Sequence, residues 1–242
     1  MLKILKVIFV AFAMIFVANA ATKISDKELK EIESLTLFQG AQIKVMDGYD
    51  MDSVYLLKIT SRGNSDTIYL TKDKKYLIAG NVISTADGKK LDVPADVSAL
   101  YGKEAFTFGK GKDEYILFTD PECPYCKKFE SYFTQIEDKV KIKVFFFPLS
   151  FHPNAKDLSL YIMAQKSYDS KVKAMLNATK DTYEFINRDI AQAKLDKLQK
   201  SLDMQMEMGM KLGVQGTPSL YDGKGNKLSW VDMLASYGIR VQ

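Results

Sequence analysis

The chain has 242 residues, of which 47% are hydrophobic and 26% charged, with 34 lysines and arginines against 30 aspartates and glutamates. This length allows one large domain or two small ones with a hydrophobic core, and the composition is that of an ordinary soluble protein. The small formal net charge of +4 argues against a nucleic-acid-binding protein, which would show a clustered basic face.

The first twenty residues, MLKILKVIFVAFAMIFVANA, have the pattern of a secretory signal peptide. Two lysines precede an apolar run at 7–17, and Ala-Asn-Ala at 18–20 is a small-x-small cleavage site. The run is short for a membrane span, and an uncleaved N-terminal anchor is the alternative. We expect cleavage after Ala20, which leaves an exported mature chain with a net charge of about +2.

The segment after this leader is predicted to form a small antiparallel-sheet domain over residues 21–92. A short helix is expected at 25–35, with Ser25 as its N-cap. Residues 41–92 are rich in Val, Ile, Tyr and Leu and are interrupted by turn-forming sequences. This pattern predicts about four or five strands joined by hairpins. An edge of such a sheet is a pairing surface.

Residues 93–112 differ in composition from the segments on either side. Pro94 suits a first helical turn, and a helix is predicted from there to about Ala105, followed by Gly109 and Gly111. We expect a linker helix with a flexible joint between two domains. The sequence GKGK lacks the spacing of a phosphate-binding loop and is expected to be a solvated loop.

The second domain is expected over residues 113–242. EYILFTD at 114–120 and KIKVFFFPLS at 141–150 predict buried strands, and the phenylalanines at 145–147 are assigned to the core. Apolar residues at helical spacing lie between the two strands. A strand, a helix and a strand at this spacing predict a parallel β-α-β unit.

The remainder of the chain is predicted to be a helical insertion followed by a hairpin and a final helix. Helical patterns without strand patterns extend over about 154–213, and TPSLYD and KLSW predict the hairpin. Methionines at every second position of 204–210 resemble a copper(I) motif. Residues two apart do not share a helical face, so core and surface positions are expected there.

The chain has only two cysteines, Cys123 and Cys126, in the segment FTDPECPYCKKFE. A disulfide that closes so short a loop stabilises little, because the entropic effect grows with loop length. A zinc site usually needs four ligands, and His152 is the only histidine. We therefore predict no metal and no cofactor. For His152 we expect a structural role, with tuning of the redox site as the alternative.

Thiol–disulfide exchange needs a thiolate nucleophile and a second thiol that resolves the mixed disulfide. The cysteine pair lies at a predicted strand-to-helix junction, where the helix dipole and free N–H groups lower a thiol pKa. Pro124 suits the first turn. Cys123 is the predicted nucleophile and Cys126, one turn later, the predicted resolving thiol. The carboxylate of Glu122 would raise the pKa of its neighbour.

These motifs resemble the thioredoxin fold and, more narrowly, the DsbC/DsbG family of periplasmic disulfide isomerases. FTDPECPYCKKFE resembles the family's active-site segment, with Cys-Pro-Tyr-Cys in the DsbG form, and LGVQGTPSLYDGKGN resembles its cis-proline segment. TIYLTKDKKYLIAGNVIS resembles part of its dimerisation domain. The resemblance covers essentially the whole mature chain. It implies a mixed α+β and α/β fold, in which a thioredoxin-like catalytic domain with a helical insertion follows a small antiparallel-sheet dimerisation domain.

The resemblance also implies roles for individual residues and partners. Thr217 and Pro218 correspond to the loop that positions the client strand, and Pro124 and Tyr125 tune the redox pair between the cysteines. A periplasmic homodimer is implied, with exported client proteins that carry disulfides or oxidised thiols. A membrane electron donor of the DsbD type would keep the pair reduced. No nucleic-acid partner is expected.

One departure from classical thioredoxins affects the expected proton chemistry. Those proteins carry a buried aspartate six residues before the first cysteine, where this chain has Leu117. Proton transfer from Cys126 is therefore expected to use water, Glu122 or Asp120. The second, structural disulfide of DsbC-type proteins is also absent, which is closer to DsbG.

Four functions remain open from the sequence. The favoured one is a disulfide isomerase or reductase. A DsbG-like reductase of sulfenic acids and a net disulfide oxidase use the same cysteine pair. A chaperone-like client-binding module belongs to a different class, in which the cysteines are secondary.

Overall fold

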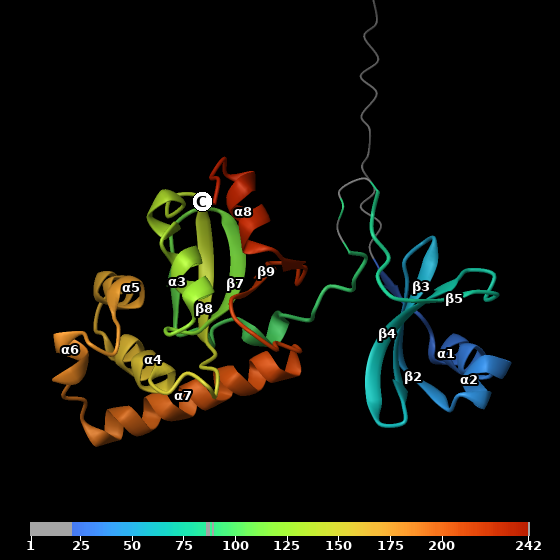
Figure 1. Cartoon of the computed structure of the whole chain (residues 1–242), viewed down its shortest axis with the longest axis horizontal. Helices are drawn as coiled ribbons and strands as arrows, with labels where there is room; N and C mark the ends of the chain where they lie inside the picture. Colours follow the sequence, from blue (N-terminus) through green and yellow to red (C-terminus); the bar gives the residue numbers. More distant parts are fainter. Residues whose placement is uncertain (1–20, 86–87, 89, 242) are drawn as a thin grey trace, which may run out of the picture. The chain divides into compact units, whose positions relative to one another are not determined.

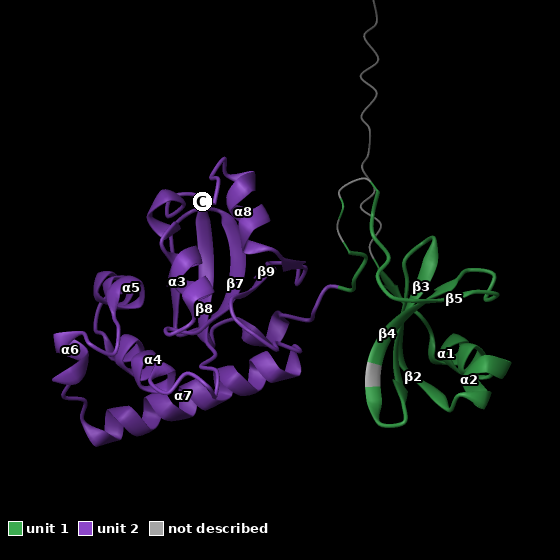
Figure 2. Ribbon diagram, viewed as in Figure 1, with its two compact units in different colours: residues 1–93 green, residues 94–242 purple. Residues whose placement is uncertain are grey.

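The computed structural model of the chain (Figure 1) describes residues 21–85, 88 and 90–241. The predicted signal peptide and its cleavage site at 1–20 lie outside the described residues. The chain divides into two compact units, Met1–Val93 and Pro94–Gln242 (Figure 2). None of the helices in the described part of the chain combines the length and the apolar character that a bilayer crossing requires.

The first unit is an antiparallel sheet in which each strand pairs with its neighbour in sequence, in the order β1-β2-β3-β4-β5. The predicted N-terminal antiparallel sheet is thus confirmed. Two short helices, α1 and α2, contact β2. The elements are β1 (Thr22–Lys23), α1 (Asp26–Glu33), α2 (Thr36–Gly40), β2 (Ile43–Asp50), β3 (Val54–Ser61), β4 (Asn64–Thr71) and β5 (Leu77–Ala79).

The core of this unit lies between the two helices and one face of the sheet. Ser25 caps α1 as predicted, since its hydroxyl accepts a hydrogen bond from the Glu28 amide at 3.3 Å. Because strand side chains alternate between faces, every second residue of the central strands points into this core. The buried apolar members are Ile24, Ile32, Phe38, Tyr55, Leu57, Ile59, Ile68 and Leu70.

The second unit contains a mixed sheet in the order β10-β9-β7-β8-β6. Its two central strands are parallel and α3 connects them, which confirms the predicted β-α-β unit. The strand β9 runs antiparallel to β7 and forms the predicted hairpin with β10. The elements are β6 (Phe106–Phe108), β7 (Asp113–Thr119), α3 (Pro124–Glu130), β8 (Val140–Phe146), β9 (Ser219–Asp222), β10 (Lys227–Leu228) and α8 (Trp230–Ser236).

Four helices follow β8 within residues 154–213, namely α4 (Ala155–Ala164), α5 (Tyr168–Asn177), α6 (Tyr183–Ile186) and α7 (Gln192–Lys211). The long helix α7 contacts both α4 and β8 (Figure 1). Its buried Gln205 accepts a hydrogen bond from the Phe146 amide at 2.8 Å. The three phenylalanines at 145–147 are buried, as predicted. Met206 and Met208 pack against the core and Met210 is exposed, so this segment has both core and surface positions, as predicted.

The prediction of a linker helix over 94–105 is wrong, because this region forms only a short 3-10 helix, Ser98–Leu100. Tertiary contacts determine its path. The Ala95 amide donates to the Gly225 carbonyl at 2.8 Å, and Val97 and Leu100 are buried against the second unit. Burial of these side chains outweighs the weak helical preference of the local sequence.

The segment GKGK at 109–112 is also not a flexible joint, since it packs closely against the turn before β8. The Gly111 amide donates to the Val140 carbonyl at 2.9 Å. Gly109 has a φ of +81°, and a Cβ at Gly111 would lie 1.8 Å from the Lys139 carbonyl carbon. Only glycine allows this approach of two backbones.

We therefore predict that Gly111→Ala lowers the free energy of unfolding of the second unit by about 2 kcal/mol or more, as overpacking does. Urea denaturation followed by the fluorescence of Trp230, the only tryptophan, measures this change. Gly216→Ala is the matched control, because its Cβ would meet nothing within 4 Å, and its effect should stay within about 0.5 kcal/mol. Equal effects of the two substitutions would contradict the close-approach explanation.

Candidate active site

The cysteine pair lies where the sequence predicts it, at the junction of β7 and α3. Cys123 is the N-cap of α3 with extended φ and ψ of −73° and 120°, and Pro124 occupies the first turn. The Cys123 amide donates to the Asp120 carbonyl at 3.1 Å, which closes the turn after β7. Proline fits this position because its missing N–H has no partner in a first turn.

The residues of the motif differ sharply in exposure. Cys126 is 0% exposed and Cys123 is 5% exposed, while the Tyr125 side chain between them is 70% exposed. Both cysteines are free thiols. Cys126 therefore faces the interior of the unit, and the Tyr125 ring lies at its surface.

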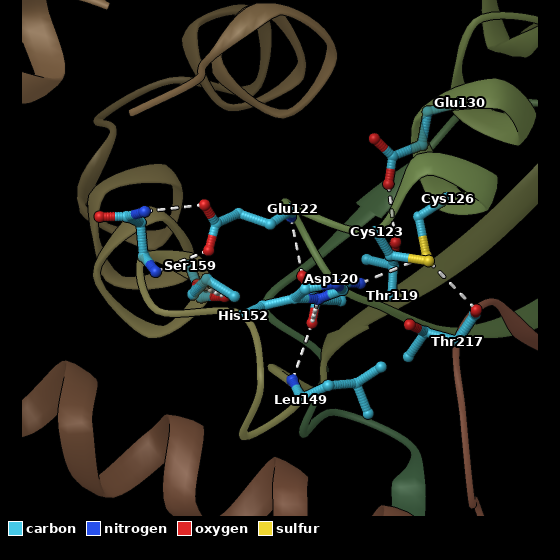
Figure 3. A network of polar contacts seen from close by, with 12 residues as sticks. Thr119, Asp120, Glu122, Cys123, Cys126, Glu130, Leu149, His152, Ser159 and Thr217 are labelled. Atoms are coloured by element: carbon cyan, nitrogen blue, oxygen red, sulfur yellow. Dashed lines mark hydrogen bonds and ion pairs between the residues drawn. The ribbon is translucent and has the colours of Figure 1, made fainter. Parts of the chain in front are cut away.

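The loop before β9 forms the opposite wall of the site (Figure 3). The Cys123 thiol donates a hydrogen bond to the Thr217 carbonyl at 3.3 Å, a bond that exists only while the thiol keeps its proton. The Thr217–Pro218 peptide bond is cis. The pairing of Phe118 with Ser219 brings this loop to the end of β7, so residues 94 positions apart meet at the sulfur.

The two thiols have opposite electrostatic environments. The hydrogen bond from the Cys126 thiol is the largest influence on Cys123 and, with the backbone N–H groups of Cys126 and Tyr125, lowers the Cys123 pKa from 9.0 to about 5. Burial raises the pKa of Cys126 above 9.0. The hydrogen bond that the Cys126 thiol donates to Cys123 and the charge of Glu130 raise this pKa further. One thiolate beside one retained proton is the charge state that exchange chemistry needs.

The carboxylates of Asp120 and Glu122 are occupied by other donors. Buried Asp120 accepts hydrogen bonds from the amides of Glu122 and Leu149, both at 2.7 Å, and its Oδ2 lies 2.8 Å from His152 Nδ1. Glu122 accepts from the backbone amide and the side chain of Asn154, at 2.6 and 2.8 Å. The two carboxylates thus hold the loop after β8 against the turn after β7 (Figure 3).

These contacts correct two expectations. The Glu122 carboxylate is directed toward Asn154 and is not among the main influences on the Cys123 pKa. The Asp120 carboxylate faces Leu149 and His152, and only its backbone amide reaches the Cys126 sulfur, at 3.5 Å. Neither carboxylate is therefore placed to receive the proton of Cys126. The structural role expected for His152 stays a prediction, because its Nδ1 contacts Asp120 in the active-site turn.

Glu130 is a buried acid near the thiols that the sequence reasoning missed. It lies on α3 four residues after Cys126 and is 2% exposed. The Thr119 hydroxyl donates to its Oε1 at 2.7 Å, and Lys127 Nζ lies 3.6 Å from its Oε2. Residues at i and i+4 share a helical face, so this spacing was the available signal. Within the described ranges, His, Cys, Asp and Glu side chains form no cluster of three or more metal ligands.

A family model for a thioredoxin-like domain matches residues 107–232. The chain therefore belongs to the thioredoxin-like family, and the predicted fold is confirmed. Together with the cysteine pair at the start of α3, this membership defines a thiol–disulfide oxidoreductase.

Three solved structures illustrate the similarity. The catalytic domain of Proteus mirabilis ScsC is 22% identical, with 57% of this chain and 90% of that chain covered and a TM-score of 0.40. A periplasmic thioredoxin-like protein from Salmonella enterica serovar Typhimurium is 21% identical, with 57% and 91% covered and a TM-score of 0.45. Helicobacter pylori DsbG is 14% identical, with 82% and 100% covered and a TM-score of 0.38. No curated protein matches the chain.

The lowered pKa of Cys123 predicts how its alkylation depends on pH. In the reduced protein, the rate of reaction with iodoacetamide should rise around a midpoint near 5 rather than 9. Cys126→Ala removes the largest stabilising hydrogen bond and should move this midpoint upward, whereas Cys126→Ser keeps a donor and should move it less. A midpoint near 9 in the unsubstituted protein would contradict the described charge state.

The same shift has a consequence for stability. Because the folded pKa lies below the ordinary value, the thiolate contributes stability to the reduced protein that is complete above about pH 9 and is lost as the pH falls through about 5. As the pH falls through this window, the free energy of unfolding of the reduced wild-type protein should therefore decrease relative to that of Cys123→Ala. Urea denaturation at a series of pH values measures this difference. Parallel curves for the two proteins would exclude the effect.

Proposed function

We propose that the protein is an exported, periplasmic enzyme of the DsbC/DsbG type that rearranges or reduces disulfides in client proteins. The observation that carries this proposal is the pair of unlike thiols at the start of α3. Cys123 has a lowered pKa and faces the loop before β9, and Cys126 is fully buried one turn later. Thiol–disulfide exchange requires a nucleophilic thiolate that can contact the client and a second, protected thiol that resolves the mixed disulfide.

The proposed reaction begins when the Cys123 thiolate attacks a client disulfide. A bond forms between Cys123 and one client sulfur, and the other client sulfur leaves as a thiolate. In isomerisation, a client thiolate then attacks the mixed disulfide and regenerates the Cys123 thiolate. In reduction, Cys126 attacks it, so that the client leaves reduced and the enzyme holds a Cys123–Cys126 disulfide. A membrane donor of the DsbD type would reduce that disulfide again.

The other predicted site residues have positions that suit roles in client contact and redox tuning. Pro124 has no N–H, so the amides of Tyr125 and Cys126 provide the backbone hydrogen bonds that lower the Cys123 pKa. The exposed rings of Tyr125 and Phe151 offer apolar surface for an unfolded client. Thr217 and Pro218 stand beside the nucleophile, where a client strand would pass. Dimerisation is assigned to the first unit, and a monomeric protein in solution would weigh against the isomerase.

A net oxidase is the second candidate, because the lowered Cys123 pKa supports it as well. A stabilised thiolate favours the reduced pair over the disulfide. That preference suits an isomerase that rests reduced, and it equally suits an oxidase that passes its disulfide to clients. A sulfenic-acid reductase would use the same thiolate. The redox state that partners maintain separates the oxidase from the isomerase and the reductase.

Refolding of a client with scrambled disulfides tests the proposed chemistry. The reduced wild-type protein should restore client activity, and Cys123→Ala should abolish this effect, since it removes the nucleophile. Cys126→Ala should retain the client as a mixed disulfide that gel electrophoresis without reductant detects. Unchanged activity in Cys123→Ala would leave only the chaperone-like function.

Thiol alkylation of the protein in its native compartment tests the direction of electron flow. The isomerase proposal expects the pair to be mostly reduced, and loss of the membrane donor should shift it to the disulfide. A pair that is mostly oxidised in unperturbed cells would support the oxidase and contradict the isomerase and the reductase.

A further inference from the structure

The backbone of Asp120 contacts both cysteines. Its carbonyl accepts a hydrogen bond from the Cys123 amide at 3.1 Å, and its amide donates one to the Cys126 sulfur at 3.5 Å. The position of this one residue therefore affects where the two cysteines lie relative to each other. That relative position matters most in the resolving step, in which the Cys126 sulfur has to approach the Cys123 sulfur in line with the bond that breaks.

The carboxylate of Asp120 is fully buried and is held by three donors. Its Oδ1 accepts from the Glu122 amide, and its Oδ2 lies 2.7 Å from the Leu149 amide and 2.8 Å from His152 Nδ1. An ionised carboxylate only accepts hydrogen bonds, so we assign a proton to His152 Nδ1. Among the donors to this carboxylate in the described part of the chain, His152 is the only side chain.

His152 and Leu149 form a fixed anchor for this carboxylate (Figure 3). Leu149 packs against a buried apolar cluster of the second unit, and the His152 amide donates to the Leu149 carbonyl at 3.0 Å. The His152 side chain is only 18% exposed, and its ring lies against the Phe151 ring with the centroids 4.6 Å apart. The Nδ1 atom is therefore held where the Asp120 carboxylate can accept from it.

Loss of the His152 donor would be felt at the redox pair. A buried carboxylate that loses a hydrogen-bond donor is unfavourable, so the Asp120 side chain would move toward other donors or water. The Asp120 backbone would move with it, together with its bonds to the two cysteines. A misplacement of about 1 Å can slow a reaction by about 100-fold.

We propose that His152 is a positioning residue that acts through Asp120 to align the two sulfurs for the resolving step, which rests on the function proposed above. In that step the Cys126 sulfur gives up its proton and bonds to the Cys123 sulfur, and the bond between Cys123 and the client breaks. The client sulfur leaves and takes up one proton. The cysteine pair is oxidised, the client sulfur is reduced, and His152 keeps its own proton throughout.

Single-turnover kinetics with glutathione disulfide test this role. The reduced protein is mixed with glutathione disulfide, quenched with acid and alkylated, so that formation and decay of the mixed disulfide at Cys123 are measured separately. His152→Ala removes the donor and should slow decay about tenfold. Formation should stay close to the wild-type rate, because it needs only the Cys123 thiolate. His152→Asn places an amide N–H where Nδ1 lies and should restore decay.

A double-mutant cycle tests whether the effect passes through Asp120. Asp120→Asn replaces one acceptor oxygen and should also slow decay. If both substitutions act on the same contact, the protein that carries both should be no slower than the slower single variant, whereas independent effects would multiply. Arg188→Gln is the matched control. Arg188 forms an ion pair of the same length, 2.8 Å, with Asp157 of α4, and its loss should leave both rates unchanged.

Several outcomes would overturn the positioning role. Decay at the wild-type rate in His152→Ala would do so, as would formation that slows as much as decay. Decay that is equally slow in His152→Asn would show that the ring acts by proton exchange. Multiplied effects in the cycle would exclude the route through Asp120, and slow decay in Arg188→Gln would assign the effect to general loosening of the helical insertion.

The experiment also separates this role from the function on which it rests. Exchange with glutathione disulfide needs no client, so the rates can be measured even if the protein fails to refold a client with scrambled disulfides. Such a failure would reject the proposed function alone, and wild-type decay in His152→Ala would reject the positioning role alone. If His152→Ala does not fold, His152→Leu takes its place, because leucine fills part of the space of the ring without a donor.

Discussion

The active site depends on the pairing of β7 with β8 on one side and with β9 on the other. This pairing brings the end of a parallel strand, the first turn of α3 and the loop before β9 to one place. Each supplies something that the others lack. The strand supplies the Thr119 hydroxyl, the helix supplies both sulfurs and free amides, and the loop supplies the Thr217 carbonyl. The hydrogen bond between the two sulfurs then stabilises the thiolate of Cys123 and keeps the proton on Cys126.

The sequence predicts those features that short-range physics controls. Periodicity identified the strands on either side of the cysteines, and Pro124 with Cys123 marked the start of the helix between them. The placement of Thr217 and Pro218 opposite the cysteines came from a family resemblance, because residues so distant in sequence leave no local signal of contact. The antiparallel sheet of the first unit followed from alternation and turn residues.

The errors concern features that tertiary contacts control. Residues 94–105 have an acceptable helical pattern, but burial of Val97 and Leu100 determines another path. Asp120 and Glu122, which lie near the cysteines in sequence, were predicted as acceptors of the Cys126 proton. Their carboxylates instead contact the loop after β8. Glu130 was overlooked because a charged residue at the end of a helix usually faces solvent. Only the packing of α3 against β7 shows that this one is buried.

The contacts of Asp120 and Glu122 tie the helical insertion to the redox site. Leu149, His152 and Asn154, which precede α4, supply the donors that these two carboxylates accept. Deletion of residues 154–213 would remove both hydrogen bonds that Glu122 accepts from Asn154, whereas the donors to Asp120, at Glu122, Leu149 and His152, would remain. The first residue of the insertion therefore helps to hold the active-site turn in place. A shortened chain that keeps this turn has to retain Asn154 or replace Glu122 at the same time.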